Sequence, residues 1–113
     1  MNEAAIRTRK INEIGELLWM PEGLDNEGMH VRLVRALDLY ESLEPSGGAE
    51  GMLATQMVAT HYAAQECLRR AALQQQTFEG RKMSLEQAHR LMALYIKQLA
   101  ALDKHRGNNH RRV

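Results

Sequence analysis

His61 and Glu66 are the residues of this sequence whose side chains come nearest to an acid–base pair, and their chemistry would be proton transfer at a site between helices. Both lie in a segment with helical periodicity, but five positions apart. Side chains share a helix face only at spacings of three or four, so these two diverge. We therefore favour a place at the solvated edge of a helix contact. No Ser–His–Asp or Cys–His arrangement can be assigned either, and we expect the protein not to be an enzyme.

Metal and thiol chemistry are also disfavoured. A helical zinc site needs two imidazoles three or four residues apart, and the five histidines offer no such pair. They are His30, His61, His89, His105 and His110. Cys67 is the only cysteine, and a buried or half-buried free thiol fits a reducing compartment. We expect no metal, no cofactor and no small-molecule substrate.

Cations gather at the end of the chain, with Asp103 as the one acid among them. They are Lys104, Arg106, Arg111 and Arg112. Each could neutralise one phosphate and so give weak, salt-dependent binding to nucleic acid. No aromatic side chain is interleaved for base stacking. A solvated, frayed terminus is the favoured interpretation, and a nucleic-acid-binding accessory protein that uses this basic tail is the alternative.

The composition favours helices within a single domain. A chain of 113 residues has no room for a second core of ordinary size. Ala, Leu, Met and Gln are frequent, whereas aromatic residues make up 4%. The net charge of +1 singles out no polyanionic partner. We read no secretory signal and no run of membrane-spanning length, so we expect a cytoplasmic protein without a membrane partner.

Breakers separate four segments with helical period. They are residues 3–19, 25–43, 49–75 and 84–105. Pro21 ends the first segment, because the residue before proline avoids the α region, and Asp25 is a plausible N-cap of the second. The pattern predicts an all-α protein, a four-helix arrangement built around an antiparallel helical hairpin.

The predicted domain, residues 1–113, divides further at its strongest break. A Pro-Ser-Gly-Gly linker at 45–48 separates a two-helix N-terminal part, residues 1–44, from the hairpin at 49–107. A flexible joint at 45–48 would let the two parts move relative to each other. Residues 108–113 are predicted to be a basic, disordered tail.

The two hairpin segments carry complementary seams. The seam of the third segment has small residues, and a partner helix can approach it closely. It consists of Leu53, Met57, Thr60, Ala64, Cys67 and Ala71. The expected seam of the fourth segment consists of Ala88, Met92, Tyr95, Leu99 and Leu102. A capping box from Ser84 to Gln87 predicts the start of the fourth helix, and Gly107 predicts its end.

Four stretches of the sequence resemble a set of short uncharacterised proteins, mostly proteobacterial and some phage-associated. The similar stretches are EGMLATQMVATH at 50–61, ECLRR at 66–70, QTFEG at 76–80 and LDKHRG at 102–107. The proteins in question continue past this point with a lysine-rich, valine-containing tail, whereas this chain continues as NNHRRV. The resemblance implies no activity. It implies that the regions around His61 and Phe78 matter beyond this one chain.

We expect a non-enzymatic protein that acts in protein–protein interaction or as a structural component, phage-associated in the sense of that resemblance. An Ala-rich seam with few large residues, and seven Met residues that suit adaptable contacts, favour a protein partner or a homodimer. The candidate interaction residues are His61, Glu66, Phe78, Lys104, Arg106, Arg111 and Arg112.

Overall fold

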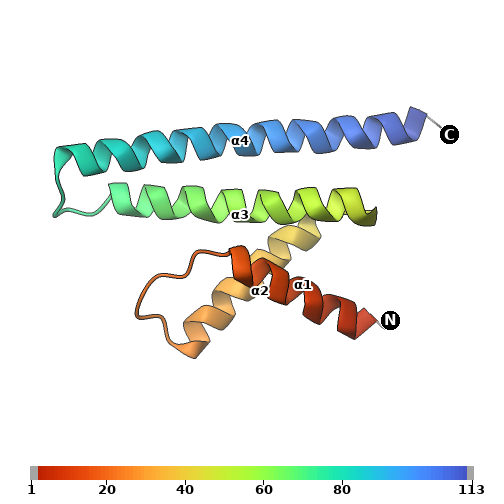
Figure 1. Cartoon of the computed structure of the whole chain (residues 1–113), viewed down its shortest axis with the longest axis horizontal. Helices are drawn as coiled ribbons and strands as arrows, with labels where there is room; N and C mark the ends of the chain where they lie inside the picture. The colour runs from red at the N-terminus through yellow and green to blue at the C-terminus, as the bar shows by residue number, and fades with distance from the viewer. Residues whose placement is uncertain (1–2, 112–113) are drawn as a thin grey trace.

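The computed structural model describes the backbone of residues 3–111 and the side chains of residue 5 and residues 7–108. It contains four helices: α1 (Glu3–Leu17), α2 (Asn26–Ser42), α3 (Gly47–Ala71) and α4 (Phe78–Arg111). No strand occurs within residues 3–111, and α3 and α4 form an antiparallel hairpin (Figure 1). The predicted all-α, four-helix fold is therefore confirmed.

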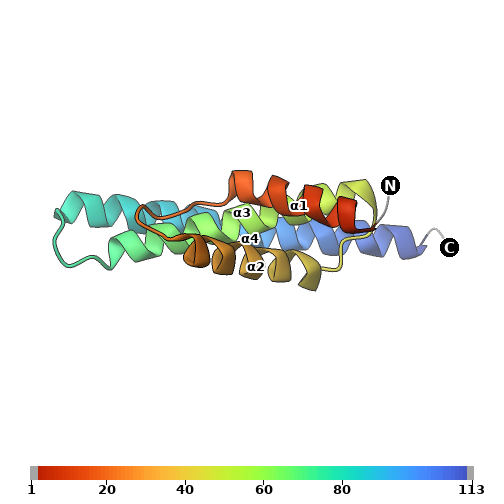
Figure 2. The ribbon, with the colours of Figure 1, turned by 90° about the horizontal axis from the view of Figure 1, so that it is seen from below.

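The central element of the fold is α3. Its one side is covered by α4, and its other side by α1 and α2 (Figure 1), which lie next to each other across it (Figure 2). Of the described helices, only α3 packs against α4. The Cα radius of gyration is 16.4 Å, compared with about 13 Å for a compact chain of this length. This elongated shape leaves much of α4 in contact with solvent.

The contact of α3 with the first two helices holds a small apolar core. Ile14 of α1 and Leu18, the first residue after its end, are buried together with Ala36 of α2 and Val58 of α3. Gly15 allows α1 and α2 to approach, since a Cβ atom there would lie 3.2 Å from the Leu33 side chain. The glycine that weakens α1 in isolation thus has a packing role.

The contact between α3 and α4 uses the predicted seam of α3 and a shifted seam of α4. On α3, Met57, Thr60 and Ala64 are buried as expected. On α4, six buried or half-buried side chains along one face form what we call the inner row: Ser84, Ala88, Leu91, Tyr95, Gln98 and Leu102. The predicted seam was wrong at Met92 and Leu99, which are 42% and 40% exposed. Both belong to a second apolar row that adjoins the inner row on the helix surface.

The observed ends of α2 and α4 show which of the predicted capping residues start or end a helix. The Asp25 cap is confirmed, because its Oδ1 accepts from the Gly28 N–H at 2.7 Å. The Ser84 capping box was wrong as a helix start. The helix α4 is capped instead by Thr77, which comes seven residues before Ser84. Its Oγ1 accepts from the Gly80 N–H at 2.9 Å. The predicted stop at Gly107 was also wrong, since α4 continues to Arg111.

The ends of α3 and of the chain differ from expectation too. The helix α3 begins at Gly47, inside the predicted linker, and ends at Ala71 rather than near residue 75. Its last carbonyls are capped from outside, because Gln76 Nε2 and Arg81 Nε each donate to the Ala71 carbonyl at 3.0 Å. Residues 108–111 are helical rather than disordered, and residues 112–113 lie outside the described part of the chain.

Candidate functional site

His61 and Glu66 make contacts with different groups of side chains. The His61 ring is half-buried between the rings of Tyr62 and Tyr95, with centroids 4.9 and 6.1 Å away. Tyr95 belongs to α4, so His61 helps to pack the hairpin. Glu66 instead accepts hydrogen bonds from Arg69 and Arg70. The predicted place at a solvated edge was wrong for Glu66, which is 5% exposed, because two arginines of the same helix compensate its buried charge.

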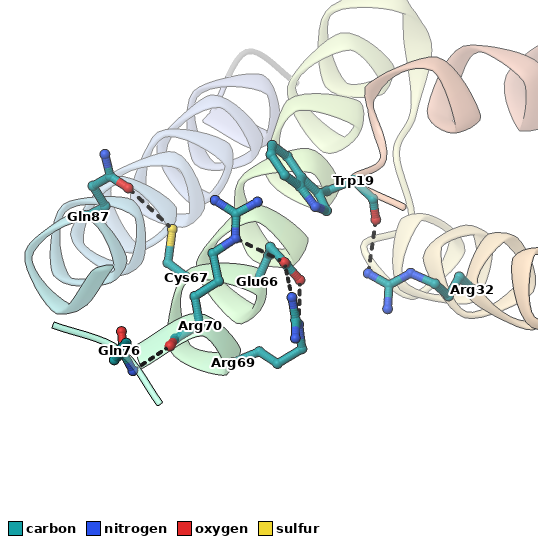
Figure 3. A network of polar contacts seen from close by, with 8 residues as sticks. All are labelled: Trp19, Arg32, Glu66, Cys67, Arg69, Arg70, Gln76 and Gln87. Carbon is teal, nitrogen blue, oxygen red and sulfur yellow. Dashed lines mark hydrogen bonds and ion pairs between the residues drawn. The ribbon is translucent and has the colours of Figure 1, made fainter. Parts of the chain in front are cut away.

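Glu66 is a buried carboxylate that accepts three hydrogen bonds from two arginines (Figure 3). Arg69 donates to it twice, from Nε at 2.9 Å and from Nη2 at 2.6 Å, and Arg70 Nε donates at 3.2 Å. These bonds, that of Arg69 first, outweigh burial and hold the pKa of Glu66 below its ordinary value. A general acid must carry a proton near neutral pH, so this carboxylate is unsuited to that task.

The same cluster fixes the connection between α1 and α2. The Arg70 guanidinium lies 4.5 Å from the centroid of the Trp19 ring, within the range of a cation–π contact. Arg32 of α2 donates to the Trp19 carbonyl at 3.0 Å (Figure 3). Glu66 therefore positions Arg70, which holds Trp19 against α3. Trp19 was not among the predicted site residues, although a lone tryptophan two residues before a proline is a signal for a loop anchor.

Arg106 is also engaged within the fold. Its Nε donates to Glu50 Oε1 at 3.0 Å, and its Nη2 donates to the carbonyls of Leu43 and Glu44 at the end of α2. The hydrogen bond from Arg106 is the main reason why the pKa of Glu50 lies below its ordinary value. His105 Nε2 lies 3.7 Å from Glu50 Oε2. Arg106 thus connects α4 to the residues on both sides of the 45–48 linker. Its charge is paired with Glu50 and is not free for a phosphate.

The other predicted tail cations divide into two groups. Lys104 is exposed on α4. Arg111 is the last residue of α4, with a side chain outside the described set, and Arg112 lies wholly outside it. Binding of nucleic acid by the basic end therefore stays a prediction, with Arg106 removed from the residues that could carry it.

Phe78 is the first residue of a row of exposed apolar side chains along α4. It is 80% exposed and Ile96 is 67% exposed, and Leu85, Met92 and Leu99 on the same side of α4 are between 40% and 49% exposed. We call these five residues the outer row: Phe78, Leu85, Met92, Ile96 and Leu99. Four of them recur every seven residues, which is the repeat of a helix contact. A shallow hollow lies along its first turns, lined by Phe78, Arg81, Lys82, Leu85, Glu86, His89 and Arg90.

Charged residues follow the outer row along one flank. Glu79, Glu86 and Lys97 each come one residue after a member of the row, and so lie about 100° further round the helix. Lys104 continues this flank seven residues after Lys97. All four are exposed. The outer side of α4 is thus an apolar strip bordered by a strip of charge, the pattern of a helix that packs against a second partner.

Neither the described side chains nor comparison with other proteins points to another kind of site. Among them, no group of three or more His, Cys, Asp or Glu residues could hold a metal ion. No described helix is long and apolar enough to span a bilayer. No protein-family model, curated protein or solved structure matches this chain.

Proposed function

We propose that this chain is a non-enzymatic interaction protein that binds a protein partner through the outer row of α4. The observation that carries the proposal is the outer row itself, five large apolar side chains in register on a helix that has a partner on one side only. Scattered exposed apolar residues are ordinary on protein surfaces. A contiguous row with the repeat of a helix contact is a different feature, and it supports a specific interface.

The size of the row agrees with this proposal. Taking about 200 Å² for each fully exposed side chain, the five residues expose on the order of 500 Å² of apolar surface. That value is at the upper end of the largest apolar patch on a typical monomer, roughly 300–600 Å², where such patches are often functional. The partner is therefore expected to present a complementary apolar surface, most simply a helix.

A photo-crosslinking experiment in the native host cell tests the proposal. A benzophenone amino acid replaces Met92, which is 42% exposed in the outer row, or Leu94, which is 44% exposed on the opposite side of α4. We expect a discrete protein adduct from position 92, identified by mass spectrometry, and none from position 94. The adduct should disappear when Ile96→Glu is added. Failure to obtain an adduct at position 92, or equal adducts at both positions, would overturn the proposal.

A further inference from the structure

We infer that the partner seated on the outer row is a second copy of this chain, with the two α4 helices antiparallel about a two-fold axis near residues 91 and 92. This inference rests on the proposed function and names its partner. A homodimer with two-fold symmetry must present a self-complementary surface, so each residue has to match the one that the axis places opposite it. The outer side of α4 meets that requirement in its charges and in its apolar row.

Both acids on the flank of the outer row lie in the first half of the helix, where Lys82 and Arg90 adjoin them, and the second half of the flank carries lysines alone. Glu79 and Glu86 occupy the first half, and Lys97 and Lys104 the second. Antiparallel pairing about the stated axis brings Glu86 opposite Lys97 of the second copy, and Glu79 opposite its Lys104. Both pairs share the same midpoint, between residues 91 and 92, although nothing in the packing of α4 on α3 demands this. Symmetry makes each pair occur twice.

The apolar residues fit the same register. Met92 lies beside the two-fold axis, next to Met92 of the second copy. Leu85 falls between Ile96 and Leu99 of the second copy, so that large side chains alternate across the contact. Near each end, Lys82 comes within one helical turn of Asp103 of the second copy. A parallel pairing would instead oppose Glu86 with Glu86 and Lys97 with Lys97.

Area and angle also agree with a dimer. Two outer rows together bury on the order of 1,000 Å² of apolar surface, about the minimum of a specific interface. The outer row lies roughly a quarter turn round α4 from the inner row, because its members are offset from the inner row by one or four residues. A quarter turn separates neighbouring contacts in a four-helix bundle. The dimer therefore assembles α3, α4 and their symmetry mates into one bundle.

Charge-swap variants of the full-length chain test this register by sedimentation equilibrium. We expect the wild type to be a dimer of the 12.9 kDa chain. Glu86→Lys alone and Lys97→Glu alone each replace two attractive pairs by two repulsive ones, and should weaken dimerisation roughly tenfold. The double variant should return to the wild-type dissociation constant. An equimolar mixture of the two single variants should do the same, since unlike charges then meet across the interface.

Asp38→Lys is the matched control, because it makes the same charge change at an exposed position of α2. It should leave the dissociation constant unchanged, and circular dichroism should show the same helix content for all variants. Single swaps that dimerise as tightly as the wild type would overturn the antiparallel register. A wild type that stays monomeric while Met92 crosslinks to a different protein would overturn this inference and leave the proposed function standing. Absence of any adduct at Met92 overturns both.

Discussion

The inner and outer rows of α4 are two surfaces of one helix, of which the inner is buried and the outer is exposed. The inner row includes Ser84, Ala88 and Gln98, and it is covered by α3. The outer row has larger and more apolar residues, from Phe78 to Leu99, and it is exposed. Hydrophobicity alone would place the outer row in the core. Shape decides otherwise, because small residues at the α3 contact let the two helices approach closely.

The comparison teaches that this helix has two separate packing tasks. One row specifies the fold of the chain, and the other is available for association. A substitution in the inner row should therefore change the free energy of unfolding, whereas one in the outer row should mainly change association.

The largest expected effect comes from Leu102→Ala. Leu102 is 1% exposed, and truncation leaves a cavity between α3 and α4 that should cost about 3 kcal/mol of unfolding free energy. Leu99→Ala removes the same atoms from the outer row and should cost less than about 1 kcal/mol in the monomer. Urea unfolding at dilute protein concentration measures both. Equal losses would show that the two rows are not separate.

A smaller effect is expected from pH at the end of the inner row. The folded-state pKa of Glu50 is lowered by its bond to Arg106, so the carboxylate stabilises the fold fully above its ordinary pKa of 4.5. That contribution is lost as the pH falls through the lowered value.

Thermal unfolding of Glu50→Gln should reveal this. The variant should have a lower Tm than the wild type at pH 7, and the difference should shrink as the pH falls from about 5 to 3. Glu16→Gln, at an exposed position of α1, is the control and should follow the wild type. A difference that stays constant down to pH 3 would exclude Glu50 as the titrating group.

The smallest effect is expected from Gly107→Ala, which tests how far α4 extends. A Cβ atom at Gly107 would meet nothing within 4 Å. Gly107 is also not one of the described glycines that have a positive φ. Alanine should therefore stabilise the helix by about 0.5 kcal/mol, since glycine is a poor helix former. A destabilisation measured by urea unfolding would instead indicate the left-handed cap that the sequence predicted.

The sequence predicts the fold well where the signals are local and unopposed. The Asp25 cap acts within a few residues and is confirmed, whereas α1 ends at Leu17, two residues before the predicted end at residue 19. The start of α4 was misplaced because two capping signals compete. Thr77 is the cap observed, and the box at Ser84 then falls within a helix that has already begun.

Of the five residues of the outer row, only Phe78 was predicted from the sequence to take part in an interaction. Met92 and Leu99 were assigned to the core, because period alone cannot say which of two adjacent apolar rows meets α3. Arg106 looked like a free tail cation, since its partners lie at the far end of the hairpin. Such partners are set by tertiary structure and leave no trace in local spacing.

Arg106 also bears on the order in which the chain folds. It joins the carbonyl of Leu43 across 63 positions of sequence, so this contact closes the longest loop among the described side-chain hydrogen bonds. The entropy cost of closing a loop rises with its length, whereas the corner between α3 and α4 closes over a few residues. We therefore expect the hairpin to form first during folding and the Arg106 contact to form after it. A nascent chain cannot form this contact until Arg106 has left the ribosome, so α2 can pack on α3 before the Arg106 contact forms.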